Sequence, residues 1–529
     1  MSALAGAIGS LRSGHALSGA KESNPISSPS GHRAGRREWI GLAVIALPCL
    51  FYSMDLTVLN LAVPALTADL QPSSTQLLWI LDIYGFLVAG SLITMGTLGD
   101  RIGRRRLLMF GAAAFAITSV IAAMSTSADM LIGTRALLGL AGATLAPSTL
   151  SLIRNMFLDP DERTFAIGVW ITSYSAGGAI GPILGGIVLE HFPWGVVFLL
   201  GVPVMLLLLA LGPMLLPEYR DPDAGRPDLV SAGMSLISVL LVIYGIKQFA
   251  EHGPGWLPAA SILAGLGVAL GFVRRQRRLA DPLIDLQLFK SRAFSASLAT
   301  YMLGTVIAFG AFFFLAQYLQ MVLGLSSLKA GFGMLPFFCG FIAGTLLVPA
   351  IVRRVRPGFA MAGGLVLAAI GFVILSRVTA SSGLLIVIAG SLVFSLGLSP
   401  VFTLATDLVV GNAPPERAGA AAAISETSSE LGGALGIAIL GSIGAAVYRG
   451  LMADAIPAGV PAPAAAVARS TLGGALAEAA RLPGALGAEL VSTSRDAFMR
   501  ALELTATISA VIALGSAILA AVLLREVRR

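Results

Sequence analysis

The feature that most constrains this chain is a series of long segments without a charged residue. Leu107–Ala128 and Leu384–Thr406 are two of them, and each exceeds the roughly 18 residues that a helix needs to cross a bilayer. Only 12% of all residues are charged, whereas soluble domains carry about 25%. Alternating strands of about ten residues, which a membrane β-barrel requires, are not recognisable in the sequence. The sequence therefore predicts an all-α integral membrane protein.

Hydrophobic segments of this kind recur along the chain and predict fourteen transmembrane helices. They lie at about 39–66, 77–99, 107–125, 130–154, 164–190, 194–216, 229–249, 257–273, 294–323, 328–352, 359–377, 383–411, 417–448 and 501–524. We expect a disordered tail at 1–38, six helices in 39–220, two inserted helices and a basic linker in 221–293, and six more helices in 294–529.

Basic residues indicate how the helices are oriented. With the N-terminus inside, the clusters Arg101–Arg106, Arg274–Arg278 and Arg353–Arg356 all fall in cytoplasmic loops, as the positive-inside rule requires. Both termini are then cytoplasmic, and the pI of about 9.7 reflects topology rather than nucleic-acid binding. The two cysteines, Cys49 and Cys339, lie in apolar segments and predict neither a disulfide nor a metal site.

One long external connection joins the last two predicted spans at 450–499. Its Ala-rich pieces, Ala464–Leu482 and Gly484–Met499, are separated by a Pro-Gly turn signal. This composition is compatible with a short helical hairpin at the outer surface or with an irregular loop.

The loop after the second predicted span contains a glycine-rich, charged motif. A basic loop alone would not require an aspartate at the end of the helix or glycines around it, which permit a tight turn and close helix approach. We expect the aspartate to pair with arginine and to form a latch that holds one conformation. The motif residues are Gly96, Asp100, Arg101, Gly103, Arg104 and Arg105.

This motif resembles the G-x-x-x-D-R-x-G-R-R signature of the major facilitator superfamily. The resemblance implies two six-helix halves, and here two extra helices between them. A second motif, in the fifth span, resembles the signature of the drug–proton antiporters of that superfamily. Its glycines allow close helix packing and its proline permits a kink; they are Gly177, Gly181, Pro182, Gly185 and Gly186.

Charged residues inside predicted spans are the candidates for coupling. A carboxylate at the bilayer centre costs about 2.5–3.5 kcal/mol or more, so Glu426 and Glu430, four residues apart on one helix face, suggest a use. Asp55 lies in a segment that resembles the D-x-T-x-x-N-x-A-x-P pattern of the fourteen-span antiporter branch. Asp82 is a shallower candidate, and Arg135 resembles the intramembrane arginine of the family.

The resemblance implies a monomeric pump in a bacterial cell membrane that exports lipophilic cations, including quaternary ammonium compounds. A proton gradient would drive it, with no cofactor. Known members also carry a carboxylate in the tenth span, but Leu335–Val352 has none. The candidate cavity aromatics are Trp170, Tyr174, Phe309, Phe313 and Tyr318.

Three other functions remain open at this point. A proton symporter for a metabolite, or an anion exporter, fits the same fold, although an anion site would need more arginines deep in the spans. A membrane enzyme is disfavoured because the sequence shows no convincing Ser-His-Asp set. An ATP-driven pump is disfavoured because the sequence has no Walker motif. A channel would leave the latch motif unexplained.

Overall fold

The computed structural model describes residues 33–220, 228–279, 282–379, 383–411 and 418–525. Fourteen helices in these residues are long and apolar enough to cross a membrane, as the sequence predicts. Most of the predicted tail, residues 1–32, lies outside the described residues.

The first half of the chain forms eight helical segments, because the fourth span is broken and a short helix precedes the sixth. They are α1 (Arg36–Leu70), α2 (Ser74–Ile102), α3 (Arg104–Ala123), α4 (Ala128–Gly142), α5 (Leu145–Met156), α6 (Pro160–His191), α7 (Val196–Leu199) and α8 (Gly201–Leu215).

The remaining helices include two inserted spans and the helices of the second half. They are α9 (Leu229–His252), α10 (Trp256–Gln276), α11 (Arg292–Gln317), α12 (Ser327–Val352), α13 (Pro357–Leu375), α14 (Leu384–Gly411), α15 (Ala418–Ala455), α16 (Ala462–Ser470), α17 (Leu472–Ala479) and α18 (Gly484–Leu523). A 3-10 turn, η1 (Leu288–Lys290), precedes α11, and a π-helical turn, η2 (Tyr318–Val322), continues it.

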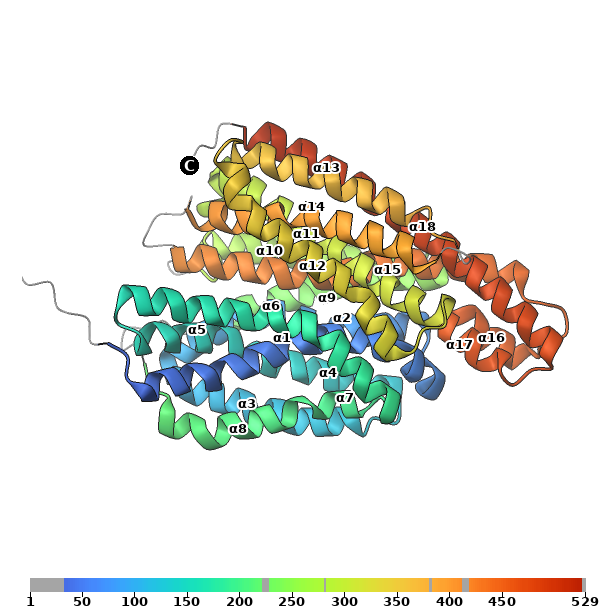
Figure 1. The fold of residues 1–529 in the computed structure, drawn as a ribbon, viewed down its shortest axis with the longest axis horizontal. Helices are drawn as coiled ribbons and strands as arrows, with labels where there is room; N and C mark the ends of the chain where they lie inside the picture. Colours follow the sequence, from blue (N-terminus) through green and yellow to red (C-terminus); the bar gives the residue numbers. More distant parts are fainter. Residues whose placement is uncertain (1–32, 221–227, 280–281, 380–382, 412–417, 526–529) are drawn as a thin grey trace, which may run out of the picture.

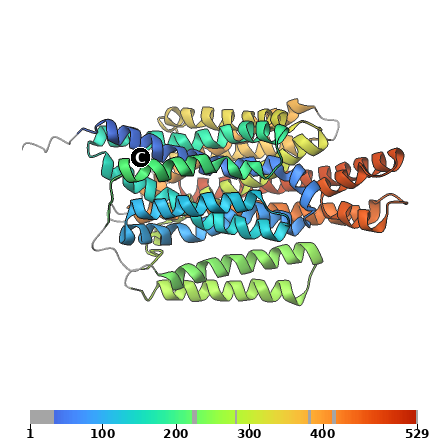
Figure 2. The same cartoon turned by 90° about the horizontal axis from the view of Figure 1, so that it is seen from below.

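The helices are arranged in two groups that converge at one end of the molecule. Helices α1–α8 form the lower group in Figure 1, and α11–α15 with α18 form the upper group. We call the end where α1 begins and α18 ends the terminal end, and the end that carries α16 and α17 the opposite end. Figure 2 shows α9 and α10 as a pair running beside the rest of the bundle.

Close helix contacts explain the order of small residues in α6. A Cβ at Gly177 would collide with the backbone carbonyl of Leu50 in α1, and one at Gly186 would collide with Leu328 in α12. Helix α6 therefore packs against both halves of the molecule, and only glycine permits these approaches.

The fourth span is interrupted at Ala143 and Thr144, which separate α4 from α5. Pro147 lies in the first turn of α5 and has no backbone N–H, so it cannot donate to the carbonyl of Ala143, four residues earlier. The Thr144 hydroxyl instead donates to the carbonyl of Ala141 at 2.7 Å. The predicted single span at 130–154 is thus two helices on one path.

The long connection at 450–499 is largely helical. Helix α15 continues to Ala455, and α16 and α17 follow at the opposite end. The second predicted piece, Gly484–Met499, is the beginning of α18, which runs unbroken to Leu523. No proline interrupts this stretch, so the helix extends past the predicted span at 501–524.

Candidate transport site

Asp55 of α1 and Arg135 of α4 form a buried ion pair in the first half. Arg135 Nη1 lies 2.7 Å from Asp55 Oδ2, and its Nε donates to the carbonyl of Ile80 at 3.3 Å. The guanidinium also lies over the ring of Tyr84, 4.5 Å from its centroid, which adds a cation–π attraction. Both charges are therefore compensated inside the first half.

Asp82 of α2 pairs with Lys247 of α9. Lys247 Nζ lies 2.7 Å from Asp82 Oδ2, and neither side chain is exposed at all. The ammonium also lies 3.7 Å from the centroid of the Trp79 ring. Although Asp82 lies at a shallow position in its span, it is not exposed, because the inserted helix α9 covers it.

Lys247 is a residue that the sequence reasoning missed. The sequence could have identified it, because Lys247 is the single basic residue inside the otherwise apolar span at 229–249. A charge at that position requires a partner within protein, and the remaining candidate at similar depth was Asp82.

Glu426 and Glu430 lie on α15 and differ from the paired charges of the first half. Both are half-buried, and neither has an ion-pair partner among the residues that the structure describes. Tyr52 of α1 lies beside Glu430 and interacts electrostatically with it. Glu426 lies close enough to Tyr174 of α6 and Tyr301 of α11 to interact electrostatically with both. The two carboxyl groups therefore lie between the halves, and tyrosines from both halves surround them.

Residues of both halves line an aromatic cavity of about 320 Å³, whose wall includes neither Glu426 nor Glu430. Its volume falls within the usual range of small-molecule sites, about 300–1,000 Å³. Tyr174 belongs both to its wall and to the surroundings of Glu426. The helices α1, α6, α11, α12 and α14 contribute the lining residues Ser53, Leu56, Thr57, Tyr174, Gly178, Ala308, Phe309, Phe312, Phe337, Phe338, Phe341, Ile342, Thr345, Leu346, Leu398 and Phe402.

The predicted cavity aromatics are divided among several places. Tyr174 and Phe309 line the central cavity. Trp170 lies behind Tyr174 with ring centroids 4.9 Å apart, and its indole N–H donates to the Thr149 hydroxyl at 3.0 Å. The structure adds a group of phenylalanines, mostly from α12, that sequence reasoning did not single out: Phe312, Phe337, Phe338, Phe341 and Phe402.

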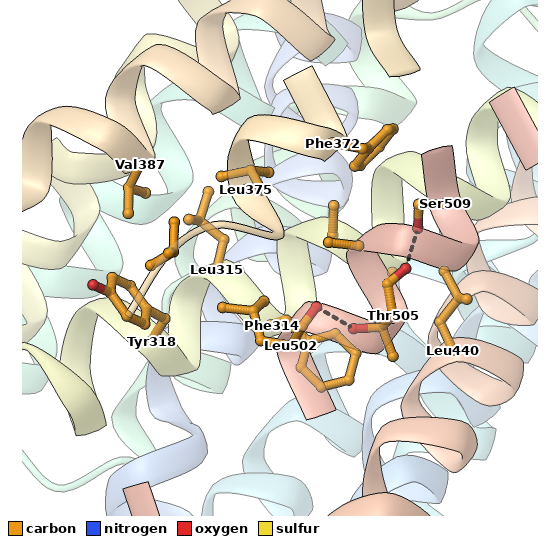
Figure 3. A pocket seen from close by; sticks show the side chains of 14 residues that line it. Phe314, Leu315, Tyr318, Phe372, Leu375, Val387, Leu440, Leu502, Thr505 and Ser509 are labelled. Atoms are coloured by element: carbon orange, nitrogen blue, oxygen red, sulfur yellow. Dashed lines mark hydrogen bonds between the residues drawn. The ribbon is translucent and has the colours of Figure 1, made fainter. Parts of the chain in front are cut away.

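Phe313 and Tyr318 lie away from that cavity. Phe313 lines a separate void of about 50 Å³ beneath α16. Tyr318 lies in the interior of the second half beside Leu315 and Leu375 (Figure 3), and its hydroxyl donates to the carbonyl of Thr379 at 3.1 Å. Helical periodicity could not separate these positions from Phe309, because all lie on one long helix that is packed on several sides.

The latch motif forms a network at the terminal end. Arg104 Nε donates to Asp100 Oδ1 at 2.7 Å, and Arg104 Nη1 donates to the carbonyl of Pro147 at 3.2 Å. Gly103 has a φ of +112°, which explains the glycine there. Glu218, after α8, accepts from the backbone N–H of Arg105 at 3.2 Å. All these partners belong to the first half.

The remaining predicted motif residues have separate positions. Gly96 packs near Pro147, and Arg101 is exposed at the end of α2. In α6, Gly181 and Gly185 face Thr57 and Val58 of α1. The carbonyl of Pro182 packs on Gly331 of α12, which joins the two halves on the side of the opposite end.

Comparisons with known proteins agree with this architecture. The sequence model of the Major Facilitator Superfamily matches residues 45–437. The multidrug efflux pump LfrA of Mycolicibacterium smegmatis is 43% identical over 500 residues, covering 94% of this chain and 99% of the relative. The methyl viologen resistance protein SmvA of Salmonella typhimurium is 38% identical, covering 88% and 93%.

Two further comparisons extend these results. The tetracenomycin C resistance and export protein of Streptomyces glaucescens is 34% identical, covering 92% of this chain and 91% of the relative. The solved structure of a bacterial homologue of the human lysosomal transporter Spinster, inward-facing and unoccupied, has a TM-score of 0.68 at 17% identity. The match covers 93% of this chain and 98% of that one, and it concerns the fold alone.

Proposed function

The chain belongs to the major facilitator superfamily and is a multi-pass membrane transporter rather than an enzyme, and we propose that it is a proton-driven drug exporter. Its substrates are lipophilic cationic drugs, dyes and quaternary ammonium compounds, which it carries out of the cell in exchange for protons. It works as a monomer in a bacterial cell membrane, with both termini cytoplasmic and without a cofactor. The names of the relatives, a multidrug pump and a methyl viologen resistance protein, support the substrate class.

The observation that carries this proposal is that Glu426 and Glu430 have no ion-pair partner among the described residues, while Tyr174 connects their surroundings with the aromatic cavity. In the first half, Asp55 and Asp82 each have a basic partner within 2.7 Å. The two glutamates have none among the described residues, and tyrosines surround them instead. Such carboxyl groups can be neutralised either by a proton or by a cationic substrate, but not by both at once.

Exchange follows from this competition. Burial among protein groups favours the protonated carboxyl, and two neighbouring carboxyls are costly to ionise together. A cation that enters the cavity reverses this preference, because it stabilises the ionised form and releases a proton. The aromatic walls retain the apolar body of the substrate and interact with its charge. Cation export and proton import are thereby coupled at one site.

The other predicted residues support the conformational change. Asp55 and Arg135 hold α1 against α4, and Asp55 exchanges its proton only if Arg135 moves away. The Asp100–Arg104 pair holds α2 to α3 and α5 at the terminal end. The glycines of α6 permit the close contact with α1 and α12 that closes the opposite end. An anion exporter is less compatible with this site, because Asp55 already neutralises Arg135.

The test is dye transport by purified protein in proteoliposomes under an imposed pH gradient. We expect Glu430→Gln to abolish gradient-driven transport while expression stays normal, because glutamine cannot exchange a proton. Glu503→Gln is the matched control, since Glu503 is an exposed carboxylate on α18 that pairs with Arg500. Unimpaired proton-driven transport by Glu430→Gln would refute the proposal.

A further inference from the structure

The inserted helix α9 contacts both halves of the molecule, and it is attached most firmly to the first half. Lys247 of α9 forms the fully buried ion pair with Asp82 of α2. Nearer the terminal end, a Cβ at Gly90 of α2 would collide with Leu236 of α9, so the two helices also pack closely there. Helix α9 is therefore fixed to α2 at two levels.

The packing of α9 against α15 of the second half is looser. Ile243 of α9 shares a buried apolar cluster with Ala434 of α15. Nearer the terminal end, a void of about 30 Å³ remains between α2, α9 and α15, and Thr427 and Leu431 of α15 line it. The atoms around a void lack van der Waals partners on one side. Apolar packing therefore holds α9 less firmly to α15 than to α2.

Arg449 of α15 joins three helices at the opposite end. Its guanidinium donates to the Ser74 hydroxyl at the start of α2 and to the carbonyl of Ala250 in α9. That carbonyl has no donor within its own helix, because the residue four positions later is Pro254, which has no N–H. The negative end of the α9 dipole and the carboxylate of Glu251 add an electrostatic attraction. One side chain of the second half therefore binds the first half and α9 together.

This junction lies where the two halves approach each other. Figure 1 shows the two groups of helices converging toward the opposite end. Other contacts between the halves at this end involve α1 and α6. Gln71, which follows α1, donates to Glu478 of α17 at 3.3 Å, and Gly331 of α12 packs on Pro182 of α6. Arg449 instead holds the edge that α2 and α15 form.

We propose that Arg449 is a gating residue of the transport cycle and that α9 forms the inserted part of its gate. In this conformation the guanidinium holds the opposite end closed. When that end opens, α15 withdraws and the guanidinium leaves Ser74 and Ala250, while the Asp82–Lys247 pair keeps α9 on α2. The inserted helices thus move with the first half, and α9 offers the second half a docking carbonyl that is free of helical hydrogen bonding.

This inference rests on the proposed function only in that the two ends open in turn, and distance measurements test it without transport. Spin labels are attached in pairs at exposed positions of the opposite end, in a Cys339→Ser background because Cys339 is exposed. Met124→Cys marks the first half, Ala453→Cys marks α15 and Ala260→Cys marks the inserted pair. Double electron–electron resonance in lipid nanodiscs then reports the distance between the two labels of each pair.

Arg449→Met should raise the ratio of long to short distances between positions 124 and 453 about tenfold, because a charged donor to two helices is lost. The distances between positions 124 and 260 should stay unchanged. Ser74→Ala removes only the acceptor on α2 and should raise the first ratio by a smaller factor. The matched control is Arg495→Met, because Arg495 of α18 donates to the carbonyl of Met321 at 2.9 Å and both belong to the second half.

Three outcomes overturn the gate. In the first, neither Arg449→Met nor Ser74→Ala changes the distances between positions 124 and 453. In the second, Arg495→Met changes them as much as Arg449→Met does. In the third, the distances between positions 124 and 260 lengthen together with those between 124 and 453, so that α9 moves with the second half. Absence of gradient-driven dye transport by the unmodified protein would instead refute the proposed function, because these distances are measured without a substrate or a pH gradient.

Discussion

The buried pair of Asp82 and Lys247 permits a sharp prediction about charge pairing. Removing one partner leaves the other charge buried, uncompensated and 0% exposed, which typically costs about 3–5 kcal/mol. Lys247→Met and Asp82→Asn should therefore each destabilise the protein by about that amount. The double variant removes both charges and leaves nothing unpaired, so we expect its stability to lie close to that of the unmodified protein.

The measurement is the free energy of unfolding, or the half-life of the folded protein at raised temperature, followed by size-exclusion chromatography of heated samples in one detergent. Arg500→Met with Glu503→Gln is the matched control cycle, because that pair is exposed on α18 and contributes about 0–1 kcal/mol. Single variants as stable as the unmodified protein, or a double variant as unstable as the singles, would refute the reasoning.

Three further predictions concern the latch, the α6 interface and the inserted helices. Asp100→Asn should lower the maximal transport rate more than it changes KM in transport kinetics; a change in KM alone would count against a latch. Gly177→Ala should destabilise the protein by about 1–3 kcal/mol in thermal unfolding, whereas Gly168→Ala, with open space at its Cβ, should not; equal effects would disprove the packing argument. Asp228 caps α9 and accepts hydrogen bonds from Ser231 and Arg275. Partial removal from water raises the pKa of this carboxyl, but the hydrogen bonds lower it more, so its pKa lies below the ordinary value. The charged cap then persists at every pH above about 4 and is lost only as pH falls through the lowered pKa. Amide hydrogen exchange at the start of α9, corrected for its intrinsic rate, should therefore be the same at about pH 8 and about pH 5. Faster exchange at the lower pH would contradict this.

The fold was largely predictable because the bilayer imposes strong restrictions on sequence. All fourteen predicted spans correspond to helices in the structure, since each must satisfy its backbone hydrogen bonds internally. The misplaced boundaries have local causes. Helix α18 extends back to Gly484 because no proline interrupts it before the predicted span. Hydropathy missed this first part because it detects only apolar segments, and the start of α18 is more polar.

The candidate site was predictable in its residues but not in their pairing. A charged residue inside a span costs free energy and is therefore rare unless it has a function. For this reason Asp55, Asp82 and Glu430 could be recognised from the sequence. Which of them pairs with a basic residue depends on contacts between helices far apart in sequence, such as the contact that brings Lys247 to α2. The phenylalanines of α12 could not be distinguished from lipid-facing ones for the same reason.

The pairing changes the division of labour among the carboxylates that the sequence suggested. Asp55 and Asp82 are held by Arg135 and Lys247, so a cation that approached either would have to compete with a fixed internal partner. Glu426 and Glu430 have no such competitor among the described residues, and they lie on the second half while Tyr52 and Tyr174 approach them from the first. We infer that a proton or a cation bound there alters contacts between the halves. The first half together with α9 then forms a frame whose buried charges are neutralised, and we infer that the exchange of ligands on α15 sets how the halves separate.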